Sequence, residues 1–531
     1  MDKGINLKEK LLKQTRQAQD YMLEIYFFML VVVYPFFMKD GYFEIGAAKY
    51  FFFRNVSLLI IAVMTPLAVV AFLCRRRRHE NLVKSFSGYL KKLSVTDWFV
   101  YGYFFIVIVS YLLTPYRDKA FLGAQGWYMG LVSQFIFVLI YLMFSRCFKW
   151  ENNLLYAVFI SSGVVFLLGI LNRYSIYPIS FKVKSPEFIS TLGNINWFSG
   201  YWTVFAAIGI MFYWNAGGRV LRAAAGIYVV ICFISGMTQG SQSAYIAIVI
   251  ILMLLFWLSF QANQKMYRFL EICGLFALSG QIARLLRYVP GAYMNYDDGL
   301  VKAFTNTGLT LYIGIGMIAL YLLFYYLVEH KGMQISDYKV FRWVMVIVAA
   351  IILLTYIALI AANTHAGGGI AWLADKPNFV FNDKWGNARG VTWSAGLLAY
   401  KNMTLVQKLV GVGPDCFAEY VYTIPALADR INIRFGESRL TNAHNEWITT
   451  LVNYGALGFI CYLGIFISAF SRFIKKAPVK TGLYLCAAGI CTYAVHNIFS
   501  FQQVLNAPFV FLLMGIGEGL IREEKINNNF P

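Results

Sequence analysis

The segment 343–363 reads WVMVIVAAIILLTYIALIAAN and carries no charged side chain. A helix of this length spans about 30 Å, the thickness of the hydrocarbon core of a membrane. Similar apolar segments recur along all 531 residues, of which 59% are hydrophobic and 14% are charged. A soluble domain could not bury so much apolar surface. The sequence therefore predicts an all-α integral membrane protein, with residues 1–531 forming a single membrane domain.

The apolar segments predict a polytopic bundle of about fourteen transmembrane helices. The expected spans are 21–38, 55–74, 98–114, 126–145, 154–171, 197–214, 225–239, 243–260, 268–283, 308–328, 343–363, 446–471, 481–499 and 503–521. Basic clusters follow two of them, at 75–78 and 472–480. Because Lys and Arg keep loops in the cytoplasm, both termini are expected there. The net charge of +20 is thus assigned to topology, and no nucleic-acid partner is expected.

Residues 364–443 form the longest stretch without an expected span, and they are predicted to be a long extracytoplasmic loop with short helices. Loops this long are usually functional or disordered. The aromatic residues and compatible helical patterns of this loop favour an ordered structure. Its aromatic side chains, among them Trp393, could stack on sugar rings, although Trp and Tyr are equally common as anchors at the membrane interface.

Arg389 is the first candidate for chemistry in this loop. The segment from Asn387 to Lys401 predicts a helix capped by Asn387, with Arg389 in its first turn. A helix N-terminus favours anions, and a guanidinium there offers donors suited to phosphate oxygens. The alternative is an arginine that lies on the lipid headgroup layer.

The segment Gly411–Asp415 predicts a tight turn, with Asp415 capping a helix over 416–423. Its glycines either form an ordinary turn or allow the backbone to approach a ligand.

His444 immediately precedes the twelfth expected span. With Thr441 or Asn442 as the helix cap, His444 lies in the first turn, where the helix dipole disfavours its protonation. A neutral histidine is the usual general base near pH 7, whereas a lone histidine is often structural. Glu446 and Asp415 are rival bases.

Several other polar residues lie near the expected outer ends of spans. Asn194, Asn196 and Gln242 could bind substrate or bridge helices through their amides. Arg284 and Arg287 could contact anions or anchor the ninth span at the interface. The cysteines and histidines show no metal-ligand spacing, and neither a metal nor a cofactor is expected.

Six segments, read in order along the chain, resemble the O-antigen ligase and O-antigen polymerase superfamily. The resemblance covers about residues 190–520, and its most specific element is the His-Asn pair that leads into the twelfth span. The segments are Gly193–Tyr201, Arg389–Trp393, Gly411–Phe417, Ala443–Trp447, Leu451–Gly458 and Val495–Phe501.

The resemblance implies a metal-independent membrane glycosyltransferase with a GT-C-like fold in the bacterial cytoplasmic membrane. Such enzymes move a glycan from an undecaprenyl diphosphate carrier to an acceptor hydroxyl, on a glycan or a lipid, at the outer membrane face. The resemblance assigns the diphosphate to Arg389 and activation of the acceptor hydroxyl to His444. Ligase and polymerase activities both remain open.

The chain departs from the family at one position. Where members commonly carry a second arginine, this sequence has Gly240-Ser-Gln242. A second cation is then expected from Arg284, Arg287 or Arg434, unless fewer suffice. The alternative function is a transporter that flips lipid-linked oligosaccharides, although such proteins place charged groups in mid-membrane cavities, which this sequence largely lacks.

Overall fold

The computed structural model describes residues 2–39, 44–75, 87–179, 184–373, 375–436 and 438–527. Arg76, Arg77 and Arg78 of the first basic cluster lie outside these residues. The N-terminal half contains α1 (Asp2–Phe28), α2 (Tyr34–Phe36), α3 (Ile45–Arg75), α5 (Val95–Leu113), α6 (Arg117–Leu122), α7 (Leu131–Cys147), α8 (Leu154–Arg173), α9 (Ile195–Asn215), α10 (Arg219–Thr238), α11 (Gln242–Ser259) and α12 (Asn263–Leu286).

The C-terminal half is equally helical. It contains α13 (Gly299–Thr305), α14 (Leu309–Lys331), α15 (Phe341–His365), α16 (Trp385–Asn402), α17 (Leu405–Val410), α18 (Phe417–Val421), α19 (Pro425–Phe435), α20 (Glu446–Lys476), α21 (Gly482–His496) and α22 (Ala507–Asn527). Among the described residues, two short antiparallel strands, β1 (Phe188–Ile189) and β2 (Gly193–Asn194), form the sole sheet. The protein is all-α in class, as predicted.

Ten helices within the described residues have the length and apolar composition of membrane spans: α3, α5, α8, α9, α10, α11, α12, α14, α15 and α20. Helices α7 and α21 are apolar but shorter. The expected count of about fourteen crossings therefore stays a prediction. The two shortest expected spans are parts of longer helices: 225–239 overlaps α10 up to its end at Thr238, and 268–283 lies within α12.

Helix α15 gives the clearest evidence for a membrane environment. Ile352 and Leu354 are 65% and 64% exposed, and Asn363 is the buried residue of this helix. A helix that is apolar on all sides and packs little against its own protein needs apolar surroundings. The lipid phase provides them.

Several helix boundaries differ from the expected spans for local reasons. The fourth span begins at Leu131 rather than 126, because Gly123 and Gly126 adopt positive φ angles in the preceding loop. The helix at the last expected span, α22, begins at Ala507 rather than 503, with Pro508 in its first turn, where proline is tolerated. The thirteenth ends at His496 rather than 499.

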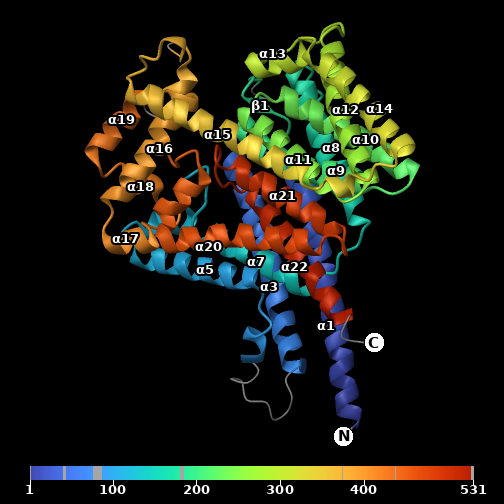
Figure 1. The fold of residues 1–531 in the computed structure, drawn as a ribbon. Coiled ribbons are helices and arrows are strands. Elements are labelled where there is room, and N and C mark those ends of the chain that lie inside the picture. The colour runs from blue at the N-terminus through green and yellow to red at the C-terminus, as the bar shows by residue number, and fades with distance from the viewer. Residues whose placement is uncertain are drawn as a thin grey trace.

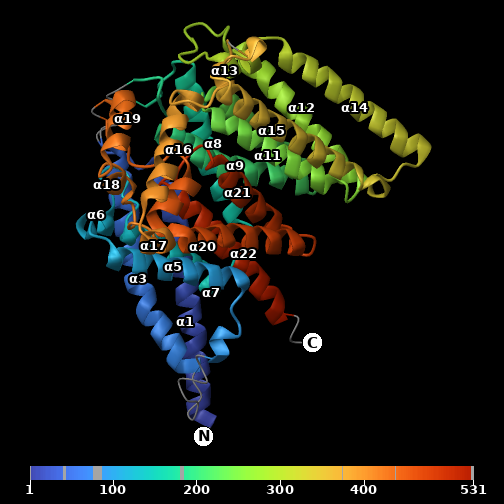
Figure 2. The ribbon, with the colours of Figure 1, turned by 60° about the vertical axis from the view of Figure 1, so that its left-hand side comes forward.

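The helices pack in neighbouring pairs, including α7 with α22, α5 with α20, and α9 with α21. In two views the N- and C-terminal ends lie on the same side of the molecule (Figure 1, Figure 2). Both views also place α17, α18 and α19 on the opposite side from α12 and α14. The main core lies among the long helices, while the segment between α15 and α20 has a smaller core that packs on α20.

The turn at Gly411 packs against a kink in α20. Helix α20 is interrupted at Gly455, which has a φ of 66°. The N–H of Val412 donates to the carbonyl of Val452 at 3.2 Å, and the N–H of Gly413 donates to that of Asn453 at 3.1 Å. The glycines therefore let the turn approach the backbone of α20, so that N–H groups of the turn donate to carbonyls near the kink. The close approach is to the backbone of α20 and not to a ligand.

We expect Gly411→Ala to destabilise the protein. Its φ is +82°, and an added Cβ would lie 2.1 Å from the Asn453 carbonyl oxygen. Backbone strain and overpacking each cost about 1–3 kcal/mol. Thermal unfolding of the detergent-solubilised protein should show a lower melting temperature. Gly299→Ala is the control, because nothing lies within 4 Å of its added Cβ; equal melting temperatures for the two variants would contradict the prediction.

Candidate functional site

Arg389 follows a turn of left-handed backbone. Gly386, Asn387 and Ala388 have φ angles of 60°, 58° and 69°, so regular helical geometry in α16 begins only after them. Among the described residues no hydrogen bond joins the Asn387 side chain to the helix, and the prediction that Asn387 caps it is wrong. The turn is positioned instead by close packing: a Cβ on Gly390 would lie 1.8 Å from the Asn382 carbonyl oxygen.

The Arg389 guanidinium contacts backbone carbonyls. Nε and Nη2 donate to the carbonyl of Phe499 at 3.2 and 2.8 Å, and Nη1 donates to that of Gly386 at 2.8 Å. No carboxylate within the described ranges pairs with it. Burial lowers the pKa of Arg389. The result is a half-buried positive charge whose surroundings offer no compensating negative charge.

His444 lies just before α20, not in its first turn as predicted. The helix cap is Asn445, whose side chain accepts from the N–H of Ile448 at 3.0 Å. Asn442 does not cap α20; its Oδ1 accepts from the N–H of His444 at 2.9 Å. This contact holds His444 at a φ of 48°. Neither Thr441 nor Asn442 is the cap, because the helix begins at Glu446.

The tertiary structure brings Arg389 and His444 together on either side of one short segment. The guanidinium lies 5.9 Å from the ring centre of Phe499, and the His444 ring meets Phe501 edge-on with 5.2 Å between centroids. One turn from Arg389, the Thr392 hydroxyl donates to the carbonyl of Ala443 at 2.8 Å. The connection between α21 and α22 thus separates the two predicted site residues.

The His444 imidazole is neutral at pH 7. Burial lowers its pKa to about 4, and the positive charge of Arg389 acts in the same direction. Its Nδ1 is buried with no hydrogen-bond partner in the described part of the chain. A neutral, unpaired ring nitrogen beside an uncompensated guanidinium can accept a proton while a nearby anion is stabilised.

We expect the low pKa of His444 to appear in the pH dependence of stability. Its folded pKa of about 4 lies below the ordinary value of 6.5, so the unfolded chain binds more protons between these values. Stability should therefore rise with pH across this window. The melting temperature of the wild type should rise more steeply from pH 4 to 6.5 than that of His444→Gln. His330→Gln controls for removal of an imidazole, and parallel curves for His444→Gln and wild type would contradict the assignment.

Glu446 is a poor rival base. It is 2% exposed, and its carboxylate accepts hydrogen bonds from the hydroxyls of Tyr462 and Tyr493 and from the amide of Asn497. These hydrogen bonds occupy both oxygens of the carboxylate. Its role is to join the start of α20 to α21.

Asp415 does not cap the helix that follows it. Helix α18 begins at Phe417 without a side-chain cap. The Asp415 Oδ2 accepts instead from the N–H groups of Ala124 and Met129, at 2.8 and 3.0 Å. Burial raises the pKa of Asp415 to about 7. The carboxyl group thereby fixes the loop before α7 against the turn before α18.

Two of the remaining predicted cations do not join Arg389. Arg287 pairs with Asp297 at 2.9 Å and with the hydroxyl of Thr305. Arg284 lies one turn earlier at the end of α12, which both ribbon views place away from α16 (Figure 1, Figure 2). Arg434 is exposed on α19, with no ion pair among the described residues. Arg284 and Arg287 therefore do not supply a second cation beside Arg389, whereas Arg434, on a helix that packs against α16, stays a prediction.

The predicted amides have separate roles. Asn194 caps α9 by accepting from the N–H of Asn196 at 2.8 Å. The side chains of Asn196 and Gln242 make no hydrogen bond within the described ranges, and Gln242 is exposed. The alternative prediction, that these amides bridge helices, is therefore wrong for all three.

Trp393 lies in an aromatic cluster beside Arg389. Its ring is 5.4 Å from that of Trp385 and 5.8 Å from that of Phe499. Its indole Nε1 is buried without a partner in the described chain. Trp393 therefore joins Arg389 in contacting Phe499.

Sequence reasoning missed the structural part that Phe499 and Phe501 play. Their backbone and rings separate Arg389 from His444, yet nothing local distinguishes them from other aromatic residues. The segment Val495–Phe501 was noticed through family resemblance alone. The role of Arg173 could not be predicted from the sequence either. Arg173 is fully buried at the end of α8 and donates to the carbonyls of Pro186 and Gln239. Gln239 immediately precedes Gly240-Ser-Gln242, where the sequence departs from the motif of the family it resembles.

Comparison of the chain with models of known protein families finds no match, and comparison with curated proteins finds none either.

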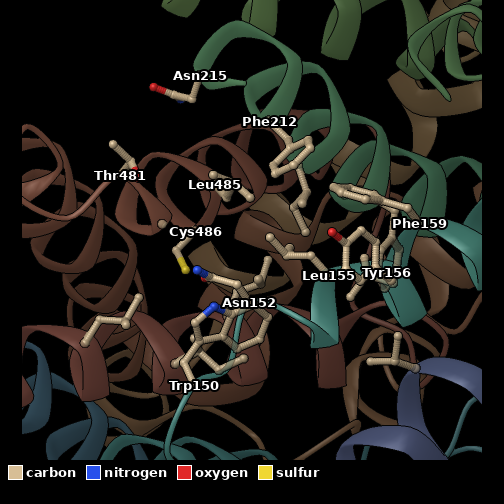
Figure 3. Close-up of a pocket in the computed structure, with 18 of the residues that line it drawn as sticks. Trp150, Asn152, Leu155, Tyr156, Phe159, Phe212, Asn215, Thr481, Leu485 and Cys486 are labelled. Atoms are coloured by element: carbon tan, nitrogen blue, oxygen red, sulfur yellow. The ribbon is translucent and has the colours of Figure 1, made fainter. Parts of the chain in front are cut away.

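An apolar cavity lies away from Arg389 and His444. It has a volume of about 400 Å³ and lies between α1, α8, α9, α21 and α22. Figure 3 shows mostly aromatic and aliphatic side chains around it, with Asn152, Asn215 and Thr481 as polar members. Nothing in its lining resembles the chemistry at Arg389.

Among the described residues, no group of three or more His, Cys, Asp or Glu side chains is placed to hold a metal ion.

Proposed function

We propose that this protein is a membrane glycosyltransferase that transfers or polymerises a glycan carried on undecaprenyl diphosphate. The acceptor is a hydroxyl group of a second glycan or of a lipid. The proposal rests on the family resemblance over residues 190–520 and on one structural observation. That observation is the pairing of a carboxylate-free guanidinium, Arg389, with a neutral histidine, His444, across the Phe499–Phe501 segment.

The proposed reaction is a direct displacement. His444 accepts the proton of the acceptor hydroxyl while the hydroxyl oxygen forms a bond to the anomeric carbon. The bond from that carbon to the phosphate oxygen breaks, and its electron pair leaves with the lipid diphosphate. Arg389 stabilises the negative charge on the departing phosphate. Because attack and departure occur on opposite faces, the anomeric configuration inverts.

The charges of the site suit this order of events. Arg389 lowers the pKa of His444 in the free protein. A bound diphosphate would offset the charge of Arg389, and the imidazole would become a stronger base when the donor is in place. Donor binding would thus prepare the histidine for proton transfer.

The membrane arrangement follows the same proposal. About fourteen helices cross a bacterial cytoplasmic membrane in a GT-C-like bundle, with both termini in the cytoplasm. The segment 364–443 and the site then lie at the outer face, where lipid-linked glycans meet their acceptors. The common side of the two termini is consistent with an even number of crossings (Figure 1).

The test is reconstitution of purified protein with an undecaprenyl diphosphate-linked glycan and a glycan acceptor. A transferase forms a new glycosidic bond and releases undecaprenyl diphosphate in equal amount. A flippase would move the glycan across a vesicle membrane without forming that bond. A subunit without its own activity would do neither, and either of these results would overturn the proposal.

A further inference from the structure

A second, polar cavity lies beside His444. Its volume is about 30 Å³, and it is enclosed by the first turns of α20, the loop before α7 and the connection between α21 and α22. Carboxylate and amide side chains line one part of it, and Trp127 and Phe501 line another. The polar members used below are Gln134, Asp415, Glu446, Asn453 and Gln502.

One side of this cavity is a rigid chain of hydrogen bonds. The Gln134 amide donates to Gln502 Oε1 at 2.8 Å, and the Gln502 amide donates to the Tyr462 hydroxyl at 3.1 Å. Tyr462 in turn donates to Glu446. The Tyr103 hydroxyl donates to the side-chain oxygen of Gln134 at 2.9 Å. Networks satisfied in this way hold their members in one arrangement.

Two other lining residues offer acceptor oxygens for which no hydrogen-bond partner is found among the described residues. Asn453 is 5% exposed, and its Oδ1 is buried with no hydrogen bond in the described part of the chain. Asp415 uses Oδ2 to hold the loop before α7, while Oδ1 has no partner among the described residues. Buried acceptors without donors are rare in folded proteins. The buried Asn453 oxygen therefore indicates a ligand that supplies a donor, and Asp415 Oδ1 offers a second acceptor within the same lining.

The cavity adjoins the proposed reaction centre through two of its lining residues. Asn442 lines the cavity and accepts from the backbone N–H of His444. Phe501 lines the cavity and contacts the His444 ring. A ligand held here would lie next to the proposed base.

We propose that this cavity binds two neighbouring hydroxyl groups of a sugar ring. Its volume has room for about two water-sized groups, and hydroxyls donate to the free oxygens of Asp415 and Asn453. The half-buried Trp127 ring, which meets Phe501 edge-on at 4.9 Å, offers an aromatic face for the sugar ring. None of the residues that line the cavity is a Lys, Arg or His, so the diphosphate is assigned to Arg389 and the sugar to this cavity. This inference rests on the proposed function.

The first experiment measures binding without any transfer step. Saturation-transfer difference NMR on the full-length protein in detergent would use methyl glucopyranoside, methyl galactopyranoside and N-acetylglucosamine as probes. Asp415→Asn and Asn453→Ala should raise the Kd of the bound probe about tenfold, as expected when a hydrogen bond to an acceptor in the cavity is weakened or lost. Asp429→Asn and Asn432→Ala, both at exposed positions on α19, are matched controls and should bind like the wild type.

Asn453→Ala also guards against misfolding, because its side-chain oxygen has no partner to lose. Absence of binding by the wild type, or equal binding by the cavity variants and their controls, would overturn the inference. The second experiment is the transfer reaction, in which the cavity variants should raise the KM of the substrate whose sugar occupies the cavity. A higher KM for the donor would show that the cavity holds the sugar of the donor. A higher KM for the acceptor would show that it holds the sugar of the acceptor.

The two proposals fail in different ways. Sugar binding that depends on Asp415 and Asn453, without any transfer, would retain the sugar cavity and overturn the transferase. Transfer that is unchanged in Asp415→Asn and Asn453→Ala would retain the transferase and overturn the sugar cavity.

Discussion

Replacing His444 with alanine is expected to reduce the rate of glycan transfer about 10²–10⁴-fold, the usual contribution of a positioned general base. The acceptor hydroxyl would then have no group to take its proton as the new bond forms. The donor KM should change little, because the imidazole acts on the acceptor rather than on the diphosphate. The measurement is steady-state transfer by purified variants that insert and unfold like the wild type.

The matched control is His330→Ala. His330 lies in the last turn of α14, where its ring contacts Tyr326. This variant should transfer glycan at the wild-type rate. Full activity of His444→Ala would remove His444 from the mechanism, and a similar loss in both variants would show that removal of any imidazole disturbs the fold.

Arg389→Gln is expected to lower transfer about 10²–10³-fold, comparable to the loss of one oxyanion-stabilising donor. Glutamine removes the positive charge opposite the leaving diphosphate. Arg389→Lys should fall between Arg389→Gln and the wild type, because an ammonium keeps the charge but lacks the two-pronged geometry that suits phosphate. Both variants should weaken donor binding, so the donor KM and kcat should be measured separately.

Arg389 also supports the fold through the carbonyls of Phe499 and Gly386. The melting temperature of each variant therefore needs to accompany its activity. Arg439→Gln is the control, since Arg439 pairs with Glu419 in the same segment of the chain. Loss of stability without loss of transfer per folded molecule would assign Arg389 a purely structural role and contradict the mechanism.

The site was partly predictable because some of its chemistry is local. The arginine in the long segment and the histidine before α20 stand out by residue type and by position next to apolar runs. Their helix caps were predicted incorrectly for a physical reason. Asn387 and Asn442 both have the composition of a cap, but left-handed backbone at 386–388 and at His444 moves the helix starts, and tertiary packing imposes that backbone.

Asp415 shows the same limit. Its sequence neighbours fit a helix cap, yet its carboxylate binds the N–H groups of Ala124 and Met129, almost 300 residues earlier in the chain. No local pattern encodes a partner at that distance. The rival base Glu446 is likewise occupied by Tyr462, Tyr493 and Asn497, which come from three different places in α20, α21 and the connection that follows.

The sequence by itself determined the all-α class and the apolar helices, because the length and hydrophobicity of a span are local properties set by the thickness of the lipid phase. The local sequence also singled out Arg389 and His444 as candidates, and the family resemblance suggested their proposed roles. The tertiary structure alone decided that Phe499 and Phe501 bring Arg389 next to His444, and that a polar cavity adjoins them. Such contacts join residues far apart along the chain, and packing and burial set their geometry and their charge states.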